Sequence, residues 1–307
     1  MNEMKIKEAE RTLRLAAEMS DYYYHKPLII CYSGGKDSDV LLAIAKKCLR
    51  PEQFEVDNHH TTVDAPETVY HIRKVFKELE EAGIRTNITM PKYQGKPISM
   101  WRLIEKKGMP PTRLARYCCQ VLKEDTTPNR LVAIGVREDE SINRRGRDSF
   151  CVPSRRMSDA EFRSTAHTYA MFKLDQYGGE DAYQCKMIEA CKKNRDTICS
   201  PIYKFTEDDI WEYIRENGIQ TNPLYSRGYK RVGCIGCPLS GPKRQQKEFE
   251  DYPKYKENYI KAFDRMQKNN EAKGKPNKLG IKNGEEWFRW WLGEDIKQVR
   301  IDDIIDE

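Results

Sequence analysis

The sequence of 307 residues has no apolar run long enough to cross a membrane. Residues 1–20 are charged and amphipathic and lack the apolar core of a signal peptide. These two absences predict a cytoplasmic protein that does not bind membranes. Thiols stay reduced in that compartment, so the ten cysteines are not expected to form a disulfide framework. There is no internal repeat, and a hydrophobic content of 38% excludes a disordered chain.

Positive charge exceeds negative charge only modestly in this sequence. The net charge is +6, which suits an anionic ligand and permits nucleic acid, but is equally typical of a solvated basic surface. A basic stretch between Lys243 and Lys278 is the candidate for nucleic-acid binding. The aromatic cluster at residues 287–291 is interpreted as a helix docked on the core or on a second subunit of a homo-oligomer. A base-stacking platform is the alternative.

The sequence also lacks the spacing of a Walker A loop, yet it contains a glycine-rich turn with the features of a phosphate site. An apolar run at residues 27–32 leads into the turn, and a helical pattern follows it. Glycines let the backbone approach an anion, and the start of a helix offers unpaired N–H groups. Hydroxyls and a lysine add further donors. The turn consists of Ser33, Gly34, Gly35, Lys36, Asp37 and Ser38.

Hydrophobic patterning predicts alternating strands and helices, and therefore an α/β fold with a doubly wound, mainly parallel sheet. The predicted strands are residues 27–32, 54–57, 85–90 and 131–135, and the predicted helices are 4–24, 37–49, 66–82 and one capped by Thr206 with Asp209. Residues 150–198 are expected to form a helical insertion. The predicted domains are an N-terminal helix at 1–26, a nucleotide-binding domain at 27–240 and a charged helical extension at 241–307.

Four further segments strengthen the interpretation of the loop: residues 63–68, 135–141, 222–225 and 233–238. Together with the loop, they resemble the phosphoadenosine phosphosulfate (PAPS) reductase family of the PP-loop adenine nucleotide alpha-hydrolase superfamily. The resemblance implies an adenine nucleotide ligand, ATP with Mg²⁺, and catalytic roles for Lys36, Asp37 and Arg137. It implies nucleotide contacts from Ser33, Gly34, Gly35, Lys36, Asp37, Ser38, Glu67, Gly135, Arg137, Glu140 and Arg144.

The residues also allow simpler interpretations of part of this set. Glu67 follows a proline at a helix start, where an acidic residue caps the helix equally well. Glu140 and Arg144 lie in a run of charges that is also typical of a solvated loop. Arg137 follows a glycine at a strand end, where a guanidinium can bind phosphate or sulfate through two N–H groups.

Four cysteines have a spacing that points to a metal centre: Cys118 and Cys119 are adjacent, and Cys234 and Cys237 form a C-x-x-C. Four thiolates suit an iron–sulfur cluster or a structural zinc. The pattern resembles the [4Fe–4S] ligands of adenylyl-sulfate reductases, and zinc is the alternative. Arg113, Arg116 and Lys123 would offset the negative charge of a cluster. The remaining cysteines have no recognisable ligand spacing.

One expected feature of the reductases is missing from the sequence. Their C-terminal Glu-Cys-Gly-Leu/Ile-His motif carries the cysteine that attacks the substrate sulfur, whereas no cysteine follows Cys237 here. The preferred hypothesis is therefore an iron–sulfur ATP pyrophosphatase that adenylylates an acceptor, tRNA or DNA, for sulfur transfer from a donor protein. The alternatives are a sulfonucleotide reductase that uses another thiol and a non-catalytic nucleotide- or nucleic-acid-binding module.

Overall fold

The computed structural model describes residues 3–124, 130–140, 150–153, 188–191, 197–275, 277 and 279–294. The chain forms two compact units, each assembled from segments that are distant in sequence. Unit 1 comprises Met1–His59, Pro66–Thr89 and Asp125–Val232, and unit 2 comprises His60–Ala65, Met90–Glu124 and Gly233–Glu307. The expected division into residues 1–26, 27–240 and 241–307 stays a prediction.

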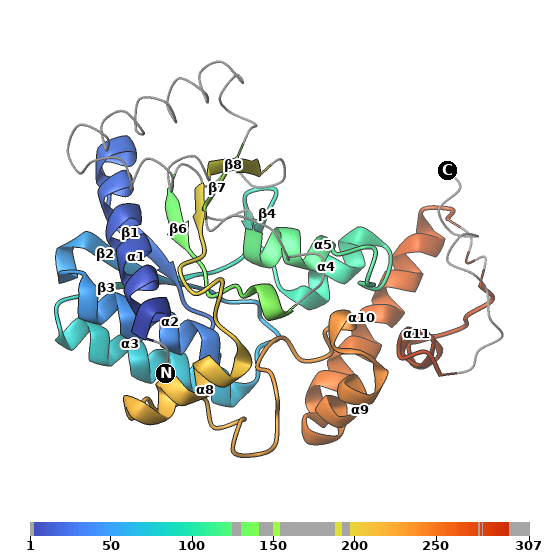
Figure 1. The fold of residues 1–307 in the computed structure, drawn as a ribbon. Helices are drawn as coiled ribbons and strands as arrows, with labels where there is room; N and C mark the ends of the chain where they lie inside the picture. Colours follow the sequence, from blue (N-terminus) through green and yellow to red (C-terminus); the bar gives the residue numbers. More distant parts are fainter. Residues whose placement is uncertain are drawn as a thin grey trace. The chain divides into compact units, whose positions relative to one another are not determined.

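Unit 1 is built on a seven-stranded sheet with the strand order β3-β2-β1-β6-β9-β7-β8. The first five strands of this order are parallel, β7 pairs antiparallel with β9, and β8 is parallel to β7. The mainly parallel α/β sheet with flanking helices is thereby confirmed (Figure 1). The strands are β1 (Leu28–Cys31), β2 (Phe54–His59), β3 (Arg85–Thr89), β6 (Leu131–Ala133), β7 (Phe150–Pro153), β8 (Ile188–Cys191) and β9 (Thr197–Cys199).

The strand sequences explain their places in the sheet. Leu28, Ile29 and Ile30 of β1 are all buried, as expected for a central strand covered on both faces. β3 contains Arg, Thr and Asn, is largely exposed, and lies at the edge of the sheet.

Residues 150–198 were expected to be helical, and that prediction is wrong for their described part, which consists of strands. The backbone N–H and C=O groups of these strands pair with neighbouring strands of the sheet, and the sequence pattern does not reveal those partners.

Within the described part of unit 1, four α-helices accompany the sheet (Figure 1). They are α1 (Glu3–Tyr24), α2 (Lys36–Cys48), α3 (Pro66–Glu81) and α8 (Glu207–Glu216). Helix α1 packs on α2 and on β6, and α2 packs on α8. Their apolar side chains join those of the strands in one buried core, as burial of one stripe of each helix requires.

Unit 2 is mainly helical. Its elements are β4 (Lys92–Tyr93), β5 (Lys96–Pro97), α4 (Met100–Lys107), α5 (Tyr117–Cys119), a π-helix at Gln120–Glu124, α9 (Pro242–Asp251), α10 (Pro253–Ala272) and α11 (Gly284–Trp291). The rings of Phe249, Tyr259, Phe263 and Trp291 pack edge-to-face or at a tilt in its core. The interpretation of the C-terminal aromatic cluster as a docked helix is confirmed for Phe288 and Trp291, which are buried.

Candidate functional site

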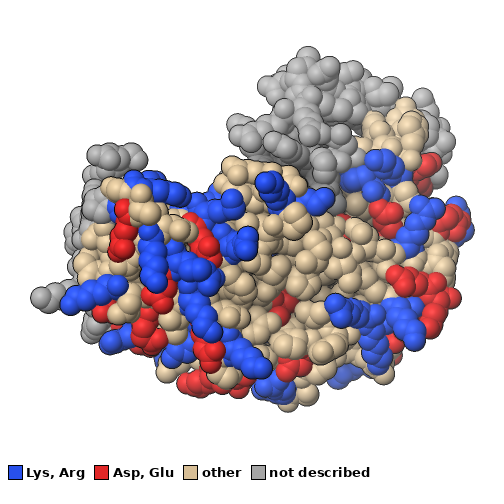
Figure 2. All heavy atoms as spheres, turned by 180° about the vertical axis from the view of Figure 1, so that it is seen from behind, with Lys and Arg blue, Asp and Glu red and all other residues tan. Residues whose placement is uncertain are grey.

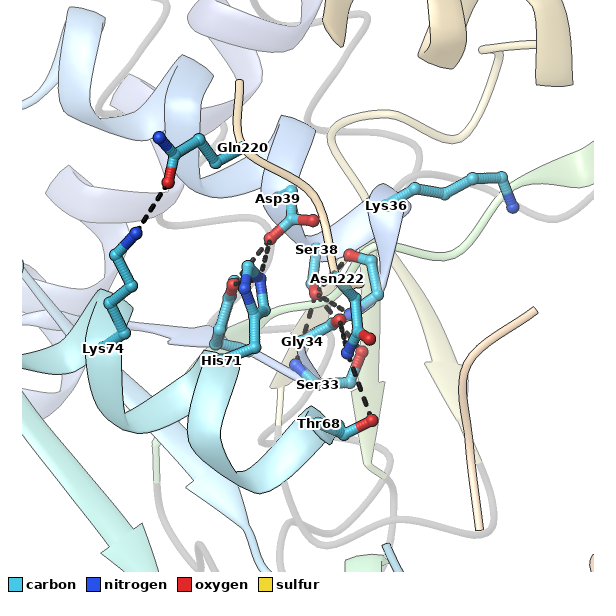
Figure 3. A network of polar contacts seen from close by, with 12 residues as sticks. Ser33, Gly34, Lys36, Ser38, Asp39, Thr68, His71, Lys74, Gln220 and Asn222 are labelled. Carbon is cyan, nitrogen blue, oxygen red and sulfur yellow. Dashed lines mark hydrogen bonds and ion pairs between the residues drawn. The ribbon is translucent and has the colours of Figure 1, made fainter. Parts of the chain in front are cut away.

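The turn between β1 and α2 is folded around the hydroxyl of Ser38 (Figure 3). Ser38 Oγ accepts the N–H of Ser33 at 3.3 Å and that of Gly35 at 3.2 Å, and donates to the Gly35 carbonyl at 2.7 Å. The Ser33 hydroxyl joins it at 3.2 Å. These bonds close a tight loop directly before the N-terminus of α2, where the helix dipole favours an anion.

Two of the predicted site glycines are required by close packing. Gly34 has φ +72°, and a Cβ there would lie 2.9 Å from the side chain of Ile72. A Cβ on Gly135 would lie 3.1 Å from the carbonyl carbon of Asp37 and 3.2 Å from the amide nitrogen of Ser38. The segment after β6 therefore abuts the first turn of α2, and a side chain at position 135 would press on backbone atoms of that turn.

Residues 222–225 hold the loop from another side. The side-chain amide of Asn222, which is 1% exposed, donates to the Gly34 carbonyl and to the Thr68 hydroxyl, each at 3.1 Å (Figure 3). The Tyr225 hydroxyl accepts the N–H of Lys36 at 2.8 Å. Burial raises the pKa of Tyr225, so this hydroxyl keeps its proton.

The charged side chains of the site form a ring of alternating sign. The Lys36 ammonium lies 3.4 Å from Asp37 and 3.6 Å from Glu207. The Arg137 guanidinium lies 2.6 Å from Asp37 and 3.4 Å from Glu207. The side chains of both cations are only 3% exposed. Two buried cations thus meet beside the start of α2. Asp37 and Glu207 each contact both cations, and Asp139 lies 3.7 Å from the Arg137 guanidinium as a third compensating carboxylate.

Three further predicted nucleotide residues are not joined to this ring by described contacts. Glu67, at the start of α3, forms an ion pair with Arg227. The side chain of Glu140 and all of Arg144 lie outside the described residues. Sequence reasoning missed Glu207, because its place in the first turn of a helix is sufficiently explained by the helix dipole. Glu207 also lies far from the loop in sequence, so no local motif indicates that the two are in contact.

Behind the loop lies a buried polar cluster that the sequence did not indicate. The Tyr32 hydroxyl donates to Asp39 at 2.6 Å and lies 3.0 Å from the imidazole of His71. Figure 3 shows Asp39 and His71 side by side. The second carboxylate oxygen of Asp39 is buried and has no hydrogen-bond partner within the described part of the chain. This cluster links β1, α2 and α3 underneath the loop.

The four predicted metal ligands all belong to unit 2. Cys118 and Cys119 lie in α5, directly before the π-helix, a distortion that is frequent at functional sites. Cys234 and Cys237 lie in a turn, where the Cys237 N–H donates to the Cys234 carbonyl at 3.3 Å. Cys234 also pairs in an isolated β-bridge with Asp64. None of the four forms a disulfide in the structure as described.

The thiols of unit 2 act on one another electrostatically. A hydrogen bond from Cys118 lowers the pKa of Cys119, and Arg116 and Lys123 act in the same direction. The same hydrogen bond raises the pKa of Cys118, and so do burial and the nearby Cys234 and Cys237. Burial raises the pKa of Cys234, although Lys123 opposes the shift. The Cys234 charge in turn raises the pKa of Lys123.

The donor chemistry of these residues fits an iron–sulfur cluster: four sulfur ligands within mutual electrostatic range and cationic side chains beside them. It fits zinc by the same criterion. Among the described residues, no three His, Cys, Asp or Glu side chains are placed to hold one metal ion.

The distribution of charged residues bears on which partners the protein could bind. Figure 2 shows one face of the molecule, on which Lys and Arg side chains are interspersed with Asp and Glu. Within unit 2, residues 90–124 contain eight Lys or Arg and two Asp or Glu residues, so this segment is strongly basic. Among the residues described, no helix combines the length and the apolar character needed to cross a membrane.

Comparison with known proteins gives the family. A model of the phosphoadenosine phosphosulfate reductase domain matches residues 27–240. The chain belongs to this family. The predicted resemblance to PAPS reductases is thereby confirmed, and the glycine-rich turn lies within the matched residues.

Individual relatives of this PAPS reductase family member are distant. An uncharacterized protein of Methanocaldococcus jannaschii is 24% identical over 238 residues, which are 75% of this chain and 40% of that protein. The adenosine 5'-phosphosulfate reductase of Oceanobacillus iheyensis is 46% identical over 40 residues, or 13% of this chain and 16% of that protein. The phosphate complex of PAPS reductase from Candida auris is 16% identical, with a TM-score of 0.45, over 74% of this chain and 87% of that one. The chain thus spans about two fifths of the length of the archaeal relative, 40%.

Proposed function

We propose that this protein is an ATP pyrophosphatase that adenylylates an acceptor in preparation for sulfur transfer. The observation that carries the proposal is the convergence of two buried cations, Lys36 and Arg137, on the PP-loop at the start of α2. Such a site is suited to a pyrophosphate group, because helix N–H groups and cations together neutralise the charge of an anion. Ser33, Gly34, Gly35 and Ser38 would supply the backbone and hydroxyl donors.

In the proposed reaction, an oxygen of the acceptor attacks the α-phosphorus of ATP and loses its proton to solvent. The bond to the bridging α–β oxygen breaks, and pyrophosphate leaves with the bonding electron pair. Lys36 and Arg137 stabilise the charge that develops on the pyrophosphate. Asp37 holds both cations in place and is the candidate for positioning Mg²⁺. A sulfur nucleophile then displaces AMP from the acceptor.

We assign Cys118, Cys119, Cys234 and Cys237 as the residues that would hold a [4Fe–4S] cluster, with zinc as the alternative. Four cysteine ligands occupy every iron of such a cluster, so it could take up sulfur only if one of the adjacent pair, Cys118 or Cys119, were not a ligand. Lys123 and Arg116 would offset its negative charge, as they already act on the thiols. The basic segment 90–124 supports tRNA or DNA as the acceptor, because Lys and Arg neutralise phosphates.

The test of the pyrophosphatase proposal is release of AMP and pyrophosphate from ATP by anaerobically purified protein with Mg²⁺ and candidate acceptors. Lys36→Ala is expected to reduce the rate by about a hundredfold or more, since it removes a charge that stabilises the leaving group. Lys46→Ala is the matched control, because Lys46 is an exposed lysine of the same helix. Equal rates for wild type and Lys36→Ala would contradict the proposal.

A second candidate function is reduction of adenylyl sulfate, because the relatives with the highest local identity include adenosine 5'-phosphosulfate reductases. In that reaction two thiols would be oxidised to a disulfide while sulfite and AMP are released. Competitive titration of ATP against adenylyl sulfate, followed by a sulfite assay, separates the two. Binding of either nucleotide without any product would favour the non-catalytic module.

A further inference from the structure

Glu207 is the first residue of α8, and its carboxylate spans the two cations of the PP-loop site. One oxygen lies 3.6 Å from the Lys36 ammonium, and the other lies 3.4 Å from the Arg137 guanidinium. The Lys36 side chain extends away from the hydroxyl groups of the loop, as Figure 3 shows. Its charge is therefore compensated by the carboxylates of Asp37 and Glu207 rather than by the hydroxyl groups of the loop.

Asp37 and Glu207 contact the same two cations but differ in how firmly they are held. Asp37 is part of the loop, its side chain is 18% exposed, and it accepts from Arg137 at 2.6 Å. Glu207 makes longer contacts, and its side chain is 52% exposed. Because water already solvates half of it, Glu207 is the carboxylate that can leave the ring at the smaller cost in free energy.

Glu207 is not needed to start its own helix. The cap of α8 is formed by Thr206 and Asp209: the Asp209 N–H donates to the Thr206 hydroxyl at 3.2 Å, and the Thr206 N–H donates to the Asp209 carboxylate at 2.7 Å. This reciprocal pair satisfies the end of the helix, as in other capping boxes. The contacts of the Glu207 carboxylate are instead directed at the site cations.

We propose that Glu207 is an internal competitor that occupies Lys36 and Arg137 until the phosphates of the nucleotide replace it, and so lowers the affinity of the site. This inference rests on the proposed function, because it requires that the PP-loop binds a pyrophosphate group. A bound phosphate and the Glu207 carboxylate are both negatively charged, and both would accept hydrogen bonds from Lys36 and Arg137. Removing the carboxylate charge therefore strengthens binding, which is the opposite of what loss of a ligand-binding residue would do.

The test is calorimetric titration of the full-length protein with inorganic pyrophosphate without Mg²⁺, and with ATP and Mg²⁺. Glu207→Gln keeps the shape of the side chain and removes its charge, and is expected to bind both ligands about three- to tenfold more tightly. Asp208→Asn is the matched control: Asp208 is the exposed next residue of the same helical turn, so its change affects the helix dipole equally. It is expected to leave both affinities within about twofold of wild type.

A readout that a purely structural role would not move is the response to salt. The gain from Glu207→Gln is expected to shrink as KCl is raised, because screening weakens the competing ion pairs. Weaker or unchanged binding by Glu207→Gln, with wild type binding normally and both proteins equally stable to heat, would overturn the inference. Weakening that occurs only with Mg²⁺ would identify Glu207 as a metal ligand and would also overturn it. Failure of wild type and all variants to bind any ligand would instead contradict the proposed function.

Discussion

At the scale of single residues, the cysteine turn of unit 2 depends on Gly236. Its φ is +73°, and a Cβ would lie 2.5 Å from the ring of Phe249 and 3.1 Å from that of Trp291. We predict that Gly236→Ala lowers the free energy of unfolding by about 2–4 kcal/mol, because the cost of a strained backbone adds to the cost of an overpacked aromatic core. Urea denaturation measures the change. Gly233→Ala is the control, since no atom lies within 4 Å of its Cβ position, and equal loss in both variants would contradict the prediction.

At the scale of elements, the segment 222–225 connects the PP-loop to α3 through Asn222. Replacing it with alanine leaves the Gly34 carbonyl and the Thr68 hydroxyl without this donor in a buried environment. We predict that Asn222→Ala costs about 1–3 kcal/mol of stability and also weakens nucleotide binding. Ser226 directly follows this segment, and Ser226→Ala removes only an exposed hydrogen bond to the Pro223 carbonyl, so it should do neither. Loss of stability without loss of nucleotide affinity would show that the loop keeps its shape without Asn222.

At the scale of the whole molecule, buried thiols make stability depend on alkaline pH. Burial raises the pKa of Cys48, in the core of unit 1, from 9.0 to about 11. Because the folded-state pKa is the higher one, the contribution of the protonated thiol is complete below pH 9.0 and is lost as the pH rises to about 11. We predict that wild type loses about 2 kcal/mol more than Cys48→Ala over this interval. Chemical denaturation at each pH measures it, and parallel stability curves would contradict it.

The sequence by itself determined the class of the fold and the position of the nucleotide loop. Apolar runs of four or more residues and helical periodicity are local signals, so β1, α2 and α3 could be located without the structure. The alternation of these elements predicted the parallel sheet. The PP-loop motif is equally local, because one turn contains the glycines, hydroxyls and lysine that a phosphate requires.

Only the tertiary structure decided which distant side chains surround that loop. Glu207 and Tyr225 follow the loop by more than 150 residues, and contact between them and Lys36 depends on chain connections that no local pattern encodes. The strands within residues 150–198 were missed for the same reason, since strands of three or four residues give a weak local signal and are stabilised by their partners in the sheet. Local chemistry thus identified the candidate anion site, whereas long-range packing determined which charged side chains surround it.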